Sequence, residues 1–167
     1  QLGHVFLTTE EVRIPIEADA ETLTWKILDY WGATVAEGEE KVADGRVTIV
    51  PAAGRKGHFI LRVVARKGDK TIADRFTTYA IIPPADLAKM PENPFGVMTH
   101  FSQGWSIDIM PLIAKAGIGS IRDEVYWASV EKKKGVYTIP PYADPYMAEA
   151  KRLGIEPLVA MTFGKKL

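Results

Sequence analysis

The sequence of 167 residues contains no cysteine, which excludes disulfide bridges and metal sites built from thiolates. Histidine is scarce as well, and His4, His58 and His100 do not have the spacing of a metal-binding motif. A glycine-rich phosphate loop is also missing, because residues 54–57 lack its pattern and are better explained as a turn between strands. We therefore expect neither a metal ion nor an organic cofactor.

Charge of one sign is not in excess, because 21 lysine and arginine residues balance 21 aspartate and glutamate residues. Such a chain has no strong field to attract nucleic acid or an anionic membrane, so we expect neither as a partner. It also has no apolar run near the roughly 18 residues that a membrane span requires. What it has is the composition of a globular protein, with 47% hydrophobic and 25% charged residues.

Residues 1–84 show the period-two alternation of apolar and polar residues that is typical of β-strands. The alternating runs lie at residues 12–16, 23–27, 47–50, 59–65 and 71–82, and a hairpin turn lies at residues 66–70. About five to seven short strands at this spacing predict a β-sandwich of the immunoglobulin or fibronectin type. Pro83 and Pro84 end it, because proline cannot donate to a central ladder.

Four aromatic residues of this part have different expected roles. Trp25 and Phe59 are expected in the core, because they are in register with aliphatic neighbours. Tyr30 and Trp31 lie in the turn after the second predicted strand, where an exposed aromatic ring could stack on a sugar. The alternative, which we favour, is that they pack over one end of the sandwich.

Residues 85–94 are rich in proline and predict a linker between domains. In residues 95–167, strand-like runs alternate with helix-like runs. The strand-like runs are residues 95–101, 118–124 and 155–161, and they are separated by two helix-like runs. This order predicts βαβ crossovers and a parallel sheet.

Capping residues support both helices. In the first helix Asp108 is the predicted N-cap, Pro111 lies in the first turn and Gly117 ends the helix in a left-handed conformation. In the second, Asp144 is the predicted N-cap and Gly154 the stop. Its first residue is predicted to be proline, and its buried face is predicted to carry Tyr146, Ala150 and Leu153.

The second part resembles the opening of a clan A glycoside hydrolase barrel. The similarity lies in residues 116–127, in Val-Glu at 130–131, in Lys-Gly-Val-Tyr at 134–137, in Asp144 and in residues 150–155. In that family an arginine of the second barrel strand precedes a tryptophan, a Val-Glu-Pro-x-x-Gly-x-Tyr loop and a helix. Lys132 stands where the family usually has proline. The resemblance implies that residues 95–167 form the start of a (β/α)8 TIM barrel, namely three strands and two helices. Residues 25–29, 45–50 and 57–64 similarly resemble the accessory sandwich that often precedes such barrels.

Candidate site residues lie where barrel strands end, because TIM-barrel sites form at the C-terminal ends of the strands. Alternation places Ser120, Arg122 and Glu124 on one face of the second strand, and we expect Arg122 and Glu124 to face the site. The resemblance implies that Arg122 hydrogen-bonds near the nucleophile carboxylate. The alternative is that it only pairs with Glu124 or Asp123 and holds the sheet together.

The other candidates for substrate binding are His100 at the end of the first strand, Trp105 in the loop after it, and Trp127 in the loop after the second strand. Trp127 matches a family position and is preferred to Trp105. The resemblance implies that Glu131 is structural. Because three lysines follow it, we expect it to form solvated salt bridges rather than to act in catalysis.

The resemblance implies two catalytic glutamates, at the ends of the fourth and seventh barrel strands, and neither is present in this sequence. We therefore expect part of a glycoside hydrolase that cleaves a β-linked glycan by a retaining mechanism, inactive without the rest of the barrel. Its partners would be a carbohydrate substrate and the remaining barrel, in the same polypeptide or a second chain. A secreted, periplasmic or cell-surface location is expected. The alternative function is a non-catalytic carbohydrate-binding or surface-interaction module whose barrel remnant serves assembly.

Overall fold

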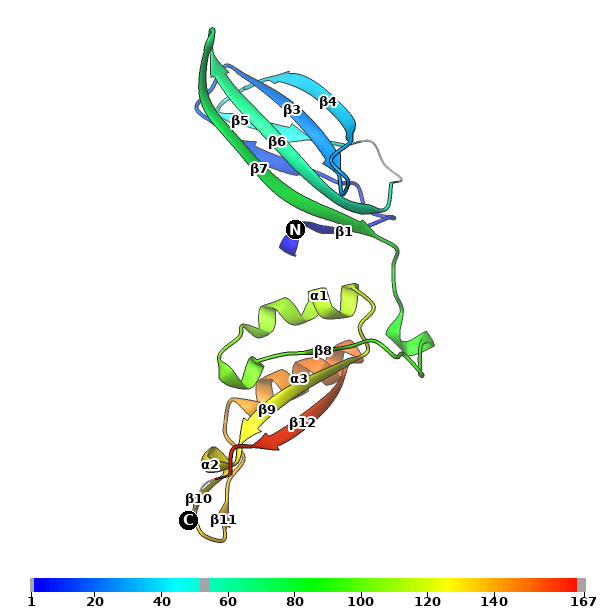
Figure 1. Ribbon diagram of the computed structural model, residues 1–167, viewed down its shortest axis with the longest axis vertical. Coiled ribbons are helices and arrows are strands. Elements are labelled where there is room, and N and C mark those ends of the chain that lie inside the picture. The colour runs from blue at the N-terminus through cyan, green and yellow to red at the C-terminus, as the bar shows by residue number, and fades with distance from the viewer. Residues whose placement is uncertain (1, 52–54, 165–167) are drawn as a thin grey trace. The chain divides into compact units, whose positions relative to one another are not determined.

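The computed structural model describes residues 2–51 and 55–164. The chain divides into two compact units, Gln1–Pro84 and Ala85–Leu167 (Figure 1). Within the described residues, no helix combines the length and the apolar character needed to cross a membrane.

The first unit consists of two β-sheets. The larger has the order β1-β7-β6-β3-β4, and only the β1–β7 pair is parallel. Its strands are β1 (Val5–Leu7), β3 (Thr22–Asp29), β4 (Thr34–Lys41), β6 (Gly57–Lys67) and β7 (Lys70–Ile82). The smaller sheet pairs β2 (Ile14–Glu17) with β5 (Arg46–Ile49) in antiparallel fashion, and the 3₁₀ turn η1 (Leu2–His4) precedes β1.

Apolar residues of both sheets form one core. Ile14 and Ile49 come from the smaller sheet, while Ile27, Leu61 and Tyr79 come from the larger one, and all five side chains are buried. Burying an aliphatic or aromatic side chain of this size contributes roughly 1.5–3 kcal/mol. The core is therefore what holds the two sheets together.

The two aromatic residues expected in this core differ in burial. Phe59 is fully buried and stacks on Tyr79, with 5.1 Å between the ring centroids. Trp25 is only partly buried and packs against the edge of the core. Its ring lies over Gly38 of β4, where an added Cβ would come within 2.7 Å of the indole. A glycine is therefore required opposite Trp25 if the ring is to keep this position.

The β-rich character expected for residues 1–84 is confirmed, but two strands were not predicted. Strand β1 has only three residues, and the edge strand β4 has few apolar residues because Glu37, Glu39, Glu40 and Lys41 make up half of it. The predicted turn at residues 54–57 is only partly covered by the structure, because Gly54 lies outside the described residues and Gly57 already belongs to β6. The end of the sheet before Pro83 is confirmed, since β7 stops at Ile82.

The packing role that we favoured for Tyr30 and Trp31 is wrong. Both lie in the tight turn between β3 and β4, and 70% of Tyr30 and 86% of Trp31 are exposed. The turn projects both rings beyond the end of the sheet, which a sequence pattern does not reveal.

Burial raises the pKa of Tyr79 from its ordinary value of 10 to about 12. The folded state therefore holds the phenol proton more tightly than the unfolded chain. The resulting stability, at most about 3 kcal/mol, is fully present below pH 10 and is lost as the pH rises toward 12. We expect the urea midpoint of the first unit to fall more steeply over this range in the natural protein than in a Tyr79→Phe variant. Parallel curves for the two proteins would contradict this prediction.

The second unit contains a three-stranded parallel sheet in the order β12-β9-β8. The strands are β8 (Gly96–Met98), β9 (Ser120–Tyr126) and β12 (Glu156–Thr162). The α-helices are α1 (Met110–Lys115), α2 (Trp127–Val130) and α3 (Ala143–Leu153), and the hairpin strands are β10 (Glu131–Lys133) and β11 (Val136–Tyr137). Three 3₁₀ turns complete it, η2 (Leu87–Lys89), η3 (Phe101–Gln103) and η4 (Ile107–Ile109).

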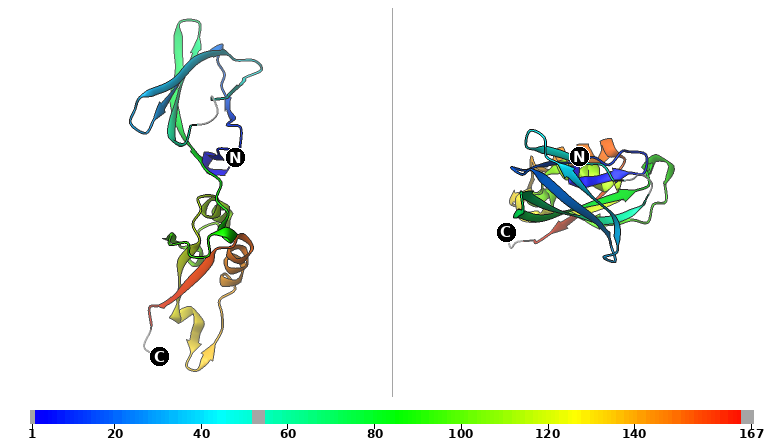
Figure 2. Two further views of the ribbon diagram at one scale, coloured as in Figure 1. Left: turned by 90° about the vertical axis from the view of Figure 1, so that its right-hand side faces the viewer. Right: turned by 90° about the horizontal axis from the view of Figure 1, so that it is seen from above.

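Helices α1 and α3 pack against the face of the sheet that carries Ile121 (Figures 1 and 2). The buried core consists of Met110 of α1, Tyr146 and Ala150 of α3, Ile121 of β9, and Ile155 just before β12. The predicted burial of the Tyr146, Ala150 and Leu153 face is confirmed, with Leu153 at its partly buried margin. The opposite face of the sheet carries no helix among the described residues.

The helix ends follow the predicted glycines but not the predicted N-caps. Gly117 and Gly154 have φ of +77° and +73°, as expected for the residues that end α1 and α3. Asp108 is not an N-cap, because Ser106 caps η4 and its Oγ accepts from the Asp108 N–H at 3.2 Å. Asp144 is also not an N-cap, since α3 begins one residue earlier and places this carboxylate in the first turn. A carboxylate in the first turn still complements the helix dipole.

The remaining boundaries differ by a few residues. Strand β8 stops at Met98, because the chain turns into η3 after Thr99, and β9 begins and ends two residues later than expected. Residues 85–94, predicted as a linker, belong to the second unit. Leu87 packs against its core, and Asn93 Nδ2 donates to the Gly117 carbonyl at 2.7 Å.

Candidate functional site

The C-terminal ends of β8, β9 and β12 lie at the same end of the sheet, because all three strands are parallel. The chain segments that follow them carry His100 after β8, Trp127 after β9 and Phe163 after β12. This end of the sheet is where the sequence predicted the candidate site.

Arg122 and Glu124 lie on the face of β9 that the helices leave open. Arg122 Nη2 is 2.9 Å from Glu124 Oε1, and the two side chains are 36% and 18% exposed. The sheet register places Met98 and Leu158 on either side of Arg122, and both are largely exposed. The open face therefore presents an ion pair between apolar neighbours, and the pairing of Arg122 with Glu124 that we considered is present.

Asp123 lies on the opposite face of β9 and is completely buried, at 0% exposure. Its Oδ2 accepts from the Thr99 hydroxyl at 2.8 Å and from the Phe101 N–H at 2.7 Å. Its Oδ1 accepts from the Ser102 N–H at 3.3 Å and from the Glu124 N–H at 2.8 Å. The carboxylate thus fixes the segment that leaves β8, including the position of His100.

Asp123 was not predicted as a member of the site. The available signal was its place between Ile121 and Val125 on the apolar face of the strand, since a carboxylate there must be buried and must find donors.

His100 and Trp105 are brought together by the segment that Asp123 fixes. Their ring centroids are 5.3 Å apart in an edge-to-face arrangement, and Phe101 contacts the other side of the same indole at 6.3 Å. His100 Nδ1 hydrogen-bonds Gln103 Oε1. Because an amide oxygen only accepts, this bond assigns the proton to Nδ1 and leaves Nε2 as an acceptor. Trp105 is 46% exposed and can contact a ligand through its ring.

Trp127 belongs to a separate group, formed by α2 and the β10–β11 hairpin. Its indole N–H donates to Glu131 Oε2 at 2.8 Å, and its ring lies 5.8 Å from that of Tyr137. Glu131 also accepts from the Gly135 N–H at 2.6 Å. The hairpin therefore holds Trp127 in a fixed, partly buried position at the end of β9.

The solvated salt-bridging role expected for Glu131 is wrong. Its side chain is buried, with 5% exposure, and both carboxylate oxygens bind groups of its own loop. The three lysines that follow it are exposed, because the hairpin turns them outward while Glu131 faces the indole. Glu131 is a structural residue of the loop.

Two further aromatic residues lie at this C-terminal end of the sheet. Tyr126 ends β9 and Phe163 follows β12, and their rings meet edge to face at 5.1 Å. Phe163 has φ of +52°, which is unusual for a residue with a large side chain. Tyr126 is 42% exposed and Phe163 69% exposed, so both rings can contact a ligand.

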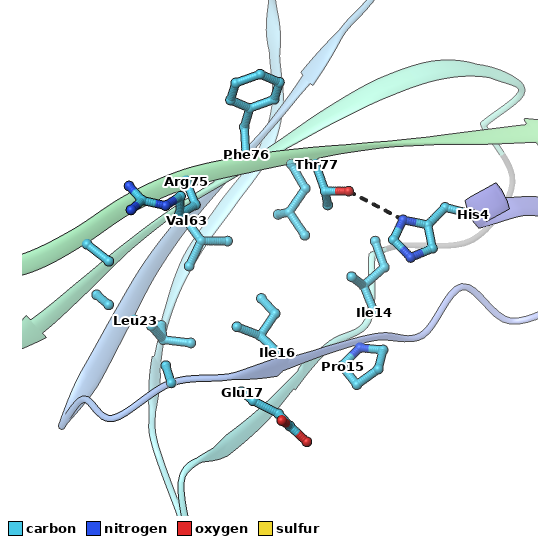
Figure 3. Close-up of a pocket in the computed structure, with 14 residues that line it drawn as sticks. His4, Ile14, Pro15, Ile16, Glu17, Leu23, Val63, Arg75, Phe76 and Thr77 are labelled. Atoms are coloured by element: carbon cyan, nitrogen blue, oxygen red, sulfur yellow. Dashed lines mark hydrogen bonds between the residues drawn. The ribbon is translucent and has the colours of Figure 1, made fainter. Parts of the chain in front are cut away.

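No group of three or more histidine, aspartate or glutamate side chains in the described ranges is arranged to hold a metal ion. A cavity of about 290 Å³ lies in the first unit, between the two sheets (Figure 3). Ile14 and Ile16 line one side and Val63 another, while His4 Nδ1 hydrogen-bonds Thr77 Oγ1 at 3.3 Å at one end. The lining is mainly apolar, and the cavity lies where the two-stranded sheet leaves part of the five-stranded sheet uncovered. Its described lining side chains do not form a catalytic group.

Comparison with solved structures places the fold of this chain among those of glycoside hydrolases. A family 39 glycoside hydrolase from the gut symbiont Bacteroides cellulosilyticus WH2 superposes with a TM-score of 0.76 at 23% identity. The match covers 97% of this chain and 33% of that enzyme. A β-glucuronidase from Ruminococcus gnavus matches with a TM-score of 0.36 at 14% identity, over 89% of this chain and 27% of the enzyme.

Neither a family model nor a curated protein sequence matches the chain. The chain thus spans about a third of the length of the family 39 enzyme. This chain, which is rich in β-strands and contains few helices, superposes on part of that enzyme over nearly all of its own length.

Proposed function

We propose that this chain is part of a glycoside hydrolase that acts on a β-linked polysaccharide or oligosaccharide. The observation that supports this most is the superposition on a family 39 glycoside hydrolase over 97% of the chain. In this proposal residues 1–84 are an immunoglobulin- or fibronectin-like accessory sandwich. The second unit supplies the first three strands and two helices of a (β/α)8 barrel.

The geometry of the second unit supports a barrel start. Its three strands are parallel, and α1 and α3 cover one face only. In a (β/α)8 barrel the helices form an outer ring, and the inner face of each strand contributes to layers of interior side chains. The open face with Met98, Arg122 and Leu158 is suited to that position, because a closed barrel would bury these exposed apolar side chains. The outer edges of β8 and β12 would pair with the strands that complete the barrel.

The proposed reaction is retaining hydrolysis through a covalent glycosyl intermediate. It requires two carboxyl groups about 5–5.5 Å apart, one as nucleophile and one as acid and base. Both catalytic glutamates would come from the rest of the barrel, and this chain would contribute no catalytic residue. Arg122 would keep the nucleophile ionised, since a guanidinium beside a carboxylate stabilises the charged form. Glu124 would orient that guanidinium through the 2.9 Å ion pair.

The aromatic residues and His100 would bind the sugar. His100 Nε2 is free to accept from a sugar hydroxyl, because Nδ1 is engaged with Gln103. Trp105 and Trp127 present ring faces that fit the C–H surface of a pyranose. We further infer that the partners are a carbohydrate and the remaining barrel, and that the location is secreted, periplasmic or at the cell surface.

The test is to express the complete reading frame that contains this chain and to assay it on nitrophenyl β-glycosides and β-linked oligosaccharides. We expect hydrolysis in which the first product, observed by proton NMR, keeps the β-configuration. The 167-residue chain alone is the matched control and is expected to be inactive. A folded complete polypeptide that hydrolyses none of these substrates, or a frame that encodes no further barrel strands, would refute the proposal.

A further inference from the structure

The turn between β3 and β4 displays two large aromatic side chains to solvent. Trp31 is 86% exposed and Tyr30 is 70% exposed. Their rings meet edge to face, with centroids 5.0 Å apart and an interplanar angle of 87°. The two rings together form a small exposed apolar patch, and patches of this kind can mark surfaces that bind a ligand.

Hydrogen bonds hold this turn in one conformation. Asp29 Oδ1 accepts from the backbone N–H groups of Trp31 at 2.9 Å and Ala33 at 3.0 Å. The Asp29 N–H donates to the Ala33 carbonyl, and Gly32, with φ of +84°, donates its N–H to the Asp29 carbonyl. The backbone that carries both rings is therefore ordered before any ligand arrives, which lowers the entropic cost of binding.

Polar groups accompany the exposed rings. Tyr30 packs edge-on against His58 at the start of β6, with 6.5 Å between the centroids. The pair therefore has a phenol hydroxyl of its own and an imidazole next to Tyr30, and both can hydrogen-bond a ligand. A pyranose needs this combination, because its C–H surface stacks on an aromatic face while its hydroxyls seek donors and acceptors.

The surroundings favour a sugar over a protein partner. A stable protein interface covers about 800 Å² on each side, with an apolar centre of several residues. The residues after Trp31 are exposed Gly32, Ala33 and Thr34, which offer little apolar surface. Among the described residues of this turn, the large exposed apolar side chains are the two rings, which together match the size of one or two sugar units.

We infer that the Tyr30–Trp31 pair is a carbohydrate-binding platform that binds a glycan chain without taking part in its hydrolysis. The choice of ligand rests on the proposed function. The platform itself lies in the first unit, and its binding can be measured without catalysis. It would raise the local concentration of substrate for the enzyme that contains this chain.

The test is affinity electrophoresis of the 167-residue chain in native gels that contain soluble xylan, mixed-linkage β-glucan or galactomannan. At least one glycan is expected to retard the natural chain, and Trp31→Ala should weaken that binding about tenfold or more. Phe76→Ala is the matched control, because Phe76 is 75% exposed on β7 of the same unit but lies outside the turn. It should be retarded like the natural chain. Both variants should unfold at the natural urea midpoint, because neither side chain is buried.

Three outcomes would overturn the inference. These are equal retardation of Trp31→Ala and the natural chain, absence of binding to every glycan, and self-association in sedimentation that only Trp31→Ala abolishes. The last result would identify a contact between protein chains instead. Failure of the proposed function is distinguishable, because it would appear as missing hydrolysis of nitrophenyl glycosides, which are too small to need the platform.

Discussion

Replacement of Asp123 with asparagine is expected to lower the free energy of unfolding of the second unit by about 3 kcal/mol. The side chain is completely buried and keeps its shape in this substitution, so the change tests the hydrogen bonds and the charge of the carboxylate without creating a cavity. Each carboxylate oxygen serves two donors. Oδ2 accepts from Thr99 and Phe101, while Oδ1 accepts from Ser102 and Glu124. In asparagine one of these oxygens is replaced by an NH2 group, which donates and cannot accept. The two protein donors that pointed at that oxygen then lose their acceptor.

The measurement is urea unfolding followed by tryptophan fluorescence, together with hydrogen exchange of the Phe101 amide. Exchange at Phe101 should accelerate, because its N–H is donated to the carboxylate at 2.7 Å. Asp108→Asn is the matched control, since the Asp108 carboxyl accepts from the Ser106 hydroxyl at the surface. A surface change of this kind should alter stability by less than about 0.5 kcal/mol. Equal stability of the two variants would show that the four hydrogen bonds to Asp123 contribute little.

The two faces of β9 could be predicted from the sequence, but the complete burial of Asp123 and its hydrogen-bond partners could not. Period-two alternation correctly separated Arg122 and Glu124 from Ile121 and Val125. The same alternation placed Asp123 with the apolar residues. What it lacked was the donor set, which comes from residues 99–102 and exists only once β8 and β9 are paired. Long-range hydrogen bonding decided this position, and local pattern does not contain that information.

Glu131 illustrates the same limit for charge. Three lysines follow it in sequence, so local composition favours a solvated loop. The chain returns at residues 136–137 to form a hairpin, which encloses the carboxylate between Trp127 and the Gly135 N–H. The glutamate side chain is enclosed by the indole and the hairpin turn, while Lys132, Lys133 and Lys134 are exposed to water. Burial of a charged residue is decided by where the chain folds back.

Helix ends were predictable because they depend on short-range chemistry. The left-handed residue that ends each helix was identified from glycine alone, at 117 and 154. The edge strand β4 was missed because an edge strand needs few apolar residues. Only Val35 and Ala36 of β4 pack against the core, so its sequence shows no clear alternation. The exposed Trp31 was misjudged for a related reason, since the sequence does not show how far a turn projects beyond its sheet.

In the enzyme with a complete barrel, replacement of Arg122 with alanine is expected to lower kcat about 100-fold and to move the acid limb of the pH–rate profile upward. The guanidinium faces the open side of the sheet and is held by Glu124 at 2.9 Å. Loss of a neighbouring positive charge raises the pKa of a nucleophilic carboxylate, so its ionised form would appear only at higher pH. Arg152→Ala is the matched control, because Arg152 forms a similar pair with Glu149 on the exposed side of α3, at 2.6 Å. It should leave both kcat and the acid limb unchanged.

If Arg122→Ala lowers stability but leaves the acid limb in place, Arg122 only holds the sheet. Partial recovery in Arg122→Lys would instead indicate that its charge acts on the nucleophile, because lysine keeps the charge but loses the planar donor geometry.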